Sequence, residues 1–142
     1  MNKFEKLTET NNVDNHYCHG INSHVKIYDY MINFEEHIMI GKVHFTKYTE
    51  NHIGTCHGGA MCTVVDDIVG WLGYCSGTKC KVGSGFTAQI NTSLKKPVPI
   101  DTVLKIIGRI DKVENRKVWI SCSLEDEQAI VYCTGIGLFI KN

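Results

Sequence analysis

Residues 60 to 72 read AMCTVVDDIVGWL, and this stretch decides which fold the sequence predicts. It contains no proline and is long enough for about three to four turns of α-helix. At about 100° per residue, its apolar side chains form a main stripe of Met61, Val64, Val65, Ile68 and Leu72, flanked by Ala60, Cys62, Val69 and Trp71. A helix that is apolar around most of its circumference is normally buried. We therefore predict a central helix covered by other elements.

A narrow polar strip remains on this helix, formed by Thr63, Asp66, Asp67 and Gly70. An unpaired carboxylate inside a protein is costly, so two adjacent aspartates on a mostly buried helix need an explanation. Two alternatives stay open at this point. Either the strip faces solvent and the pair has no role, or the carboxylates have partners or carry chemistry.

Strand patterns surround the helix on both sides. One β-rich run covers residues 38–46, and the polar residues 49–57 indicate a loop. Four further runs cover residues 85–94, 103–113, 118–124 and 129–140. The short charged segments 114–116 and 125–127 are typical of turns, which favours antiparallel hairpins. The predicted fold class is α+β, a single domain in which a curved antiparallel sheet wraps around one central helix.

We place this domain at residues 34–142 and treat residues 1–33 as an N-terminal extension of uncertain structure. Within the extension, residues 25–28 fit either a short strand or part of a helix. The 142 residues suffice for one ordinary domain with its own core.

Charge and hydropathy exclude several classes of protein. Fifteen basic residues balance fifteen acidic ones, which argues against a nucleic-acid partner. No apolar run approaches the roughly 20 residues of a membrane span, and the amino terminus lacks the apolar block of a signal peptide. We expect a soluble intracellular protein, cytoplasmic or associated with mitochondria.

The seven cysteines are an odd number without the spacing of a disulfide framework, so we expect them to be reduced and to serve as small apolar fillers. Two Cys-His dipeptides, Cys18-His19 and Cys56-His57, are the basis for a metal-binding alternative. No Cys-x-x-Cys pair accompanies them, and we expect no metal.

The chemistry-bearing motif immediately precedes the helix, where residues 51–59 read NHIGTCHGG. Two glycines at a helix start allow a ligand or another backbone to approach closely. The N–H groups of the first helical turn have no partner within the helix, and with the helix dipole they suit a developing negative charge. The oxyanion of an acyl-transfer reaction is one such charge.

This stretch resembles the hotdog-fold thioesterase superfamily, in particular its phenylacetate-pathway-like and mitochondria-associated acyl-CoA thioesterase members. The matching positions are Asn51, Gly54, His57-Gly58-Gly59 and Asp66, followed by Thr87, Asn91 and Pro97. The similarity covers residues 38–142, including the order of the strands.

The resemblance implies a homodimer or homotetramer that hydrolyses fatty or aromatic acyl-CoA thioesters at the subunit interface, without a metal or organic cofactor. By position, the Gly58 N–H is expected to polarise the thioester carbonyl. Asp66, reaching across from the partner subunit, is expected to act as general base or nucleophile, and Thr87 to hold the water. Asn51 and His57 are expected to order the loop and the thioester end of the substrate, although the His57 side chain fits an orienting role equally well.

Substrate contacts are expected from Gly59 and from Lys95 and Lys96, which offer cations to the CoA phosphates. Helical projection and motif spacing both favour Asp66 over Asp67 as the catalytic carboxylate. A non-catalytic hotdog module that binds acyl-CoA is the alternative function. A dehydratase acting on acyl-carrier-protein thioesters is less favoured, because the chain lacks the Pro-rich run of that group.

Overall fold

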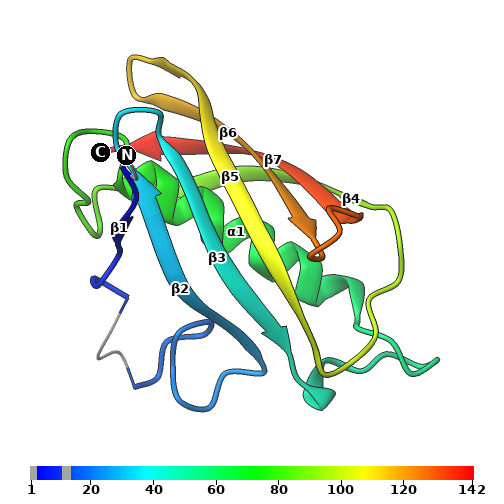
Figure 1. The fold of residues 1–142 in the computed structure, drawn as a ribbon. Helices are drawn as coiled ribbons and strands as arrows, with labels where there is room; N and C mark the ends of the chain where they lie inside the picture. Colours follow the sequence, from blue (N-terminus) through cyan, green and yellow to red (C-terminus); the bar gives the residue numbers. More distant parts are fainter. Residues whose placement is uncertain (1–2, 11–13) are drawn as a thin grey trace.

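A computed structural model of the protein describes residues 3–10 and 14–142. In Figure 1, one long helix lies against a strongly curved sheet. The elements, in chain order, are β1 (Glu5–Lys6), β2 (Val25–Asn33), β3 (Ile38–Phe45), the short 3₁₀-helix η1 (Lys47–Thr49), α1 (Gly58–Tyr74), β4 (Gly85–Leu94), β5 (Thr102–Glu114), β6 (Lys117–Glu125) and β7 (Val131–Lys141). The predicted α+β class, with one sheet wrapped around one helix, is confirmed.

The strands form one antiparallel sheet in the order β1-β2-β3-β5-β6-β7-β4. The predicted strands agree with β3 to β7 to within a few residues, because each alternates apolar and polar side chains. Chain order and sheet order differ at β4, which pairs with the last strand, β7. The sheet therefore has β1 at one edge and β4 at the other.

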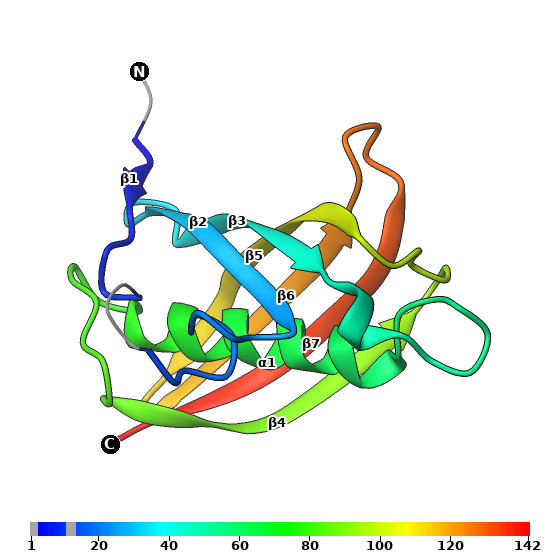
Figure 2. The ribbon, with the colours of Figure 1, turned by 90° about the horizontal axis from the view of Figure 1, so that it is seen from below.

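Helix α1 crosses the concave side of the sheet, as the view from below shows (Figure 2). The five residues of its predicted main stripe are all buried. Close packing depends on glycines in the sheet: a Cβ on Gly135 would lie 2.6 Å from a Val65 methyl, and one on Gly137 would lie 2.5 Å from a Val69 methyl. Both glycines belong to β7, so the helix approaches this strand more closely than any larger residue would allow.

The segment before β3 is part of the same sheet. Residues 25–33 form β2, which is hydrogen-bonded to β1 on one side and to β3 on the other. This strand includes residues 25–28, which from the sequence alone fit either a strand or a helix. The preceding loop passes close to α1 (Figure 2). The boundary that we place at residue 34 falls between two paired strands.

The expectation that all cysteines are reduced was wrong for two of them. Cys75 and Cys80 form a disulfide that closes the loop after α1. The two residues are only five positions apart. Cys18, Cys56, Cys62, Cys122 and Cys133 are free thiols, and all but Cys62 are buried.

No helix in the described ranges 3–10 and 14–142 is long and apolar enough to cross a membrane.

Candidate active site

The loop before α1 is held together by one side chain. The Asn51 side-chain oxygen accepts hydrogen bonds from the N–H groups of Ile53 (2.9 Å) and Thr55 (3.0 Å), and its amide donates to the Thr55 hydroxyl (2.8 Å). Gly54, with φ of +84°, makes the turn inside this loop. Asn51 is thus fully engaged in shaping the loop that leads to the helix.

His57 caps α1. Its Nδ1 accepts a hydrogen bond from the Gly59 N–H (2.9 Å), and its own backbone N–H donates to the Thr49 carbonyl (2.6 Å). Gly58, the first helical residue, has an N–H that finds no acceptor within the described part of the chain. The side chain of His57 orients the turn, and the Gly58 N–H is left available to a ligand.

Asp66 lies on the exposed surface of α1, beside the strand β4. Partial desolvation by neighbouring atoms raises the pKa of its carboxyl group, a hydrogen bond with Thr87 opposes that shift, and the charge of Asp67 adds to it. Thr87 is half-buried, and its hydroxyl oxygen also lies 3.5 Å from the place where a Cβ of Gly70 would stand. The structure therefore brings Asp66 and Thr87 together.

A bulge in β4 makes this arrangement possible. The register of β4 against β7 shifts between Thr87 and Gln89. The half-buried positions are therefore Gly85 and Thr87 before the bulge and Ile90 and Thr92 after it. Thr92 carries a buried hydroxyl without a hydrogen-bond partner among the described residues.

Gly58 and Asp66 of one chain are not brought together. They are eight residues apart on one helix, which places them about 12 Å apart along its axis. Gly58 lies instead against the far end of β4, where a Cβ on it would stand 3.2 Å from a Leu94 methyl. Within one chain, Gly58 therefore lies near the Leu94 end of β4 and Asp66 near the Thr87 end.

Asp67 occupies the opposite environment from Asp66. Its side chain is 6% exposed, and its oxygens lie 2.9 Å and 3.1 Å from the His19 Nε2. The Tyr30 hydroxyl donates a hydrogen bond of 2.8 Å to the same carboxylate. Burial, and then the charge of Asp67, raise the pKa of Tyr30, which keeps the phenol a donor. The alternative in which the whole polar strip faces solvent was wrong for Asp67.

The remaining predicted residues follow Gly58 on α1 or follow Leu94, the residue that Gly58 lies against. Gly59 is exposed in the first turn of α1, and Lys95 and Lys96 are exposed directly after β4. The backbone N–H groups of both lysines donate to the Tyr132 carbonyl, at 2.9 Å and 3.2 Å. The Lys96 ammonium lies 5.5 Å from the centre of the Tyr132 ring.

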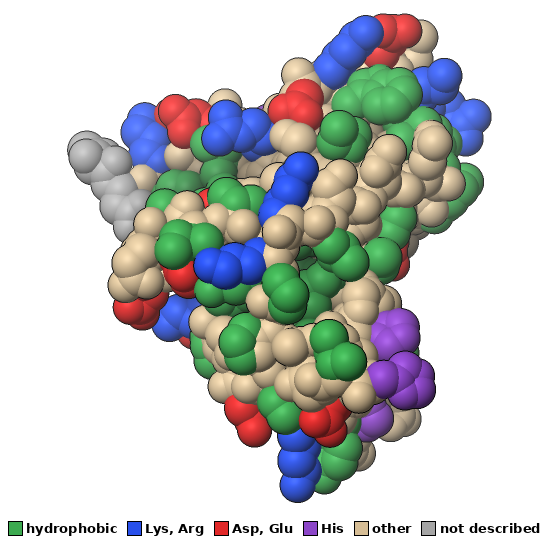
Figure 3. Space-filling view, turned by 90° about the vertical axis from the view of Figure 1, so that its right-hand side faces the viewer, with side chains coloured by type: hydrophobic (Ala, Val, Ile, Leu, Met, Phe, Trp, Pro, Cys, Tyr) green, Lys and Arg blue, Asp and Glu red, His purple; other side chains and the backbone are tan. Residues whose placement is uncertain are grey.

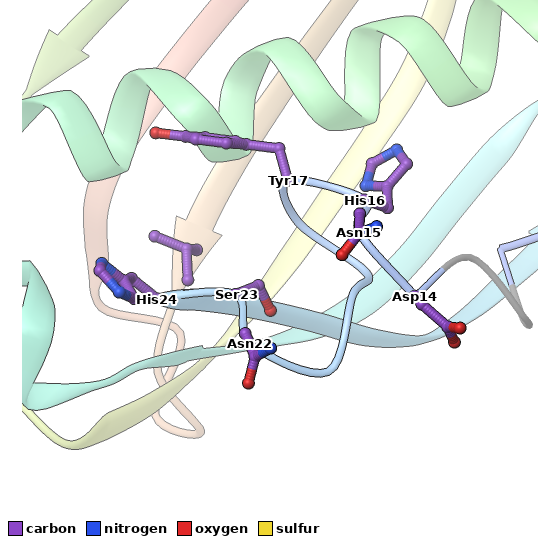
Figure 4. Close-up of a pocket in the computed structure, with 8 residues that line it drawn as sticks. Asp14, Asn15, His16, Tyr17, Asn22, Ser23 and His24 are labelled. Carbon is purple, nitrogen blue, oxygen red and sulfur yellow. The ribbon is translucent and has the colours of Figure 1, made fainter.

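Two cavities lie elsewhere in the described ranges. A cavity of about 270 Å³ is lined by the loop residues Asp14–Tyr17 and Asn22–Val25 (Figure 4). A larger one of about 650 Å³ is lined by parts of β2, β3 and β5 and by Lys6, Asp126 and Glu127. Neither is lined by Gly58, Asp66 or Thr87. Figure 3 shows the face on the right-hand side of Figure 1, where hydrophobic side chains gather near the middle with Lys or Arg side chains next to them, and other charged side chains lie toward the rim.

Sequence reasoning missed the partners of Asp67. His19 precedes Asp67 by 48 positions, in a segment without hydrophobic periodicity. The sequence offered only an indirect signal for this contact. A buried aspartate needs a polar partner, and the segment 1–33 contains two closely spaced histidines, His16 and His19.

Comparison with known protein families assigns the sequence to one of them. The sequence profile of the thioesterase superfamily matches residues 53–133, which run from the loop before α1 into β7. The chain belongs to the thioesterase superfamily. The match includes Gly58, Asp66 and Thr87.

Among curated members of the superfamily, the bovine protein named acyl-coenzyme A thioesterase THEM4 is 38% identical over 95 residues, 66% of this chain and 37% of the relative. Human acyl-coenzyme A thioesterase THEM5 is 29% identical over 97 residues, 67% of this chain and 37% of that protein. The chain thus spans little more than a third of the length of these relatives.

Solved structures of other proteins agree with the fold. The Escherichia coli PaaI protein of the phenylacetic acid degradation operon superposes with a TM-score of 0.69 at 13% identity, over 83% of this chain and 79% of that one. A Streptococcus mutans protein bound to acetyl CoA gives 0.70 at 16% identity, over 86% and 91%. The hotdog fold implied by the sequence is confirmed.

Proposed function

We propose that the chain hydrolyses acyl-CoA thioesters to a free acid and CoA, in a homodimer with two composite sites. The observation that carries the proposal is the separation of two complementary half-sites on α1. One half is the Gly58 N–H, which has no acceptor among the described residues, and the other is the exposed Asp66 carboxylate beside Thr87. The curated relatives that bear the name acyl-coenzyme A thioesterase support the same reaction.

The proposed chemistry needs only these groups and water. The Gly58 N–H donates to the thioester oxygen as it gains negative charge. Asp66, ionised at neutral pH, accepts a proton from a water that Thr87 helps to hold, and that water adds to the carbonyl carbon. The carbon–sulfur bond then breaks, and the sulfur leaves as the CoA thiol after taking up the proton. Direct attack by Asp66, through an acyl-enzyme anhydride that water hydrolyses, uses the same placement.

Two copies of the chain can join the half-sites along the free edge of β4. Antiparallel pairing of β4 with its copy, about a twofold axis near Gln89 and Ile90, brings Thr87 of each chain near the Leu94 end of the other. Because Gly58 lies against Leu94, this pairing carries the Gly58 N–H of one subunit toward Asp66 of its partner. The exposed Phe86, Leu94 and Ile136 lie on the paired strands β4 and β7, where a second copy can cover them.

The substrate's CoA portion is proposed to lie at the Gly58 end of β4. Lys95 and Lys96 follow this strand and offer two cations to the phosphates, and Gly59 leaves the first helical turn open to the thioester. The acyl portion is proposed to be fatty or aromatic. The intracellular location expected from the sequence stays a prediction.

Hydrolysis of short, medium, long and aromatic acyl-CoA by the purified protein tests the reaction. The thioester absorbance itself should be followed, because a thiol-reactive dye would also react with free thiols of the protein. Turnover is expected, and the preferred chain identifies the acyl class. Binding of acyl-CoA without any turnover would instead establish the non-catalytic binding module.

Mixing two inactive variants tests the composite site. Gly58→Pro removes the N–H, and proline suits the first helical position because His57 already has extended backbone angles (φ −61°, ψ 139°). Gly58→Ala is the matched control, since it adds a Cβ but keeps the N–H. We expect Gly58→Pro and Asp66→Asn to be inactive alone. Random mixed dimers should regain about a quarter of wild-type activity, because half of them are mixed and each has one intact site. Mixing would restore nothing if both groups acted within one chain.

A further inference from the structure

A second cluster of polar side chains lies on a different face of α1 from Asp66 and takes no part in the proposed hydrolysis. His16, His19 and Asp67 each direct one potential ligand atom into a small volume, with all three atoms within 4.8 Å of one another. The His16 and His19 ring centres are 4.7 Å apart. His16 also lines the cavity shown in Figure 4.

The contacts of His19 call for a hydrogen or a cation between its ring and Asp67. Its Nδ1 lies 2.9 Å from the Ile27 carbonyl oxygen, which only accepts, so Nδ1 is the donor in that contact. Nε2 faces the two Asp67 carboxylate oxygens at 2.9 Å and 3.1 Å. Lone pairs of nitrogen and oxygen that face each other at this distance repel unless a hydrogen or a cation lies between them, and a metal ion held by both atoms meets that need.

The surroundings match those of metal ligands. A ligating histidine usually donates its other N–H to a backbone carbonyl, as His19 does to Ile27. A ligating carboxylate is usually hydrogen-bonded in turn, as Asp67 is by the Tyr30 hydroxyl. The His19 and Asp67 side chains are only 4% and 6% exposed, so little water competes for them.

We propose that His16, His19 and Asp67 bind a divalent transition-metal cation, with Zn²⁺ as the best match. Two imidazole nitrogens and one carboxylate oxygen are donors that Zn²⁺ accepts in tetrahedral sites, with a fourth position left for water or another ligand. The site fastens the 14–24 segment to α1 at Asp67, on the helical residue next to Asp66. This assignment departs from the sequence expectation of no metal.

His16 is the ligand best suited to a test. Its Nδ1 accepts hydrogen bonds from the N–H groups of Cys18 (3.0 Å) and His19 (3.1 Å), and a cation must replace these contacts or bind Nε2 after the ring turns. An asparagine oxygen can accept the same two hydrogen bonds in a tight turn. His16→Asn therefore removes the imidazole while keeping the local backbone and the His19–Asp67 pair. Changes at His19 or Asp67 would break that pair and endanger folding.

Titration of the full chain with Co²⁺, followed by the visible absorption of the tetrahedral ion and by competition with Zn²⁺, tests the proposal. We expect one equivalent to bind to the wild type and His16→Asn to weaken binding at least tenfold. His52→Asn, the same change at an exposed histidine outside the cluster, should bind like the wild type.

Two outcomes would overturn the proposal. If millimolar Co²⁺ produces no tetrahedral absorption in the wild type, a hydrogen bond and not a metal ion joins His19 and Asp67. If His16→Asn binds the ion as tightly as the wild type, the ligands lie elsewhere, for example among the free cysteines. Neither outcome depends on hydrolysis, so the metal site and the proposed enzyme activity stand or fall separately.

Discussion

Asp66 and Asp67 are neighbours on one helix, yet they occupy opposite environments. Asp66 is exposed and has the Thr87 hydroxyl as its hydrogen-bond partner, whereas Asp67 is buried against His19 and Tyr30. A helix turns by about 100° per residue, so adjacent side chains face different surroundings. The difference separates a carboxylate that is accessible from the surface from one whose oxygens already contact neighbouring side chains.

The largest expected effect separates the two residues by activity. Asp66→Asn keeps the shape of the side chain but removes the base, so hydrolysis should fall by roughly a hundredfold or more. Steady-state kcat with the preferred acyl-CoA measures it. Folded Asp67→Asn protein should retain much more activity than Asp66→Asn. If kcat falls equally in the two folded variants, Asp66 and Asp67 do not differ in their contribution to catalysis.

Stability should reverse the order of the two variants. Asp67→Asn replaces a buried carboxylate that both His19 and Tyr30 contact, and leaving buried polar groups with poorer partners typically costs about 1–3 kcal/mol. Denaturant unfolding followed by circular dichroism should therefore show a much lower free energy of unfolding for Asp67→Asn than for the wild type. A wild-type midpoint for Asp67→Asn would mean that the pair with His19 contributes little net stability.

The sequence could place Asp66 on the polar strip of the helix but could not predict the partners of Asp67, for a physical reason. The helix and β3 to β7 follow from local periodicity, and the helical polar strip follows from the same pattern. The contact between Asp67 and His19 joins positions 48 residues apart through a loop with no periodic signal. The Cys75–Cys80 disulfide was equally invisible, because it depends on how the chain turns after α1.

Thr87 offers a finer test of the Asp66 environment. Thr87→Val removes the hydroxyl and keeps the branched shape, while Thr87→Ser keeps the hydroxyl and is the matched control. We expect kcat to fall about tenfold in the valine variant, as for the loss of one hydrogen bond to a charged group. The hydrogen bond from Thr87 lowers the pKa of Asp66, so its loss raises that pKa.

The acid limb of the kcat/KM profile should accordingly move to higher pH in Thr87→Val and stay in place in Thr87→Ser. If kcat falls in Thr87→Val but the acid limb of its kcat/KM profile stays in place, the Thr87 hydroxyl acts on the water or the substrate and not on the Asp66 carboxylate.

The smallest expected effect concerns the stability that Asp66 itself costs. Partial desolvation raises the pKa of Asp66 in the folded state, so the folded protein binds its proton more tightly than the unfolded chain does. Stability from this residue is therefore greatest below the unfolded pKa and is lost as the pH rises through the folded pKa. Asp66→Asn has no such loss, and it should be slightly more stable than the wild type at neutral pH. The advantage should disappear at acid pH, where Asp66 is protonated in both states.

The free energy of unfolding, measured against pH for the wild type and for Asp66→Asn, checks the direction of this effect. A variant that is less stable than the wild type at neutral pH would mean that the Asp66 carboxylate also contributes to the fold, and the division between the two aspartates would be lost.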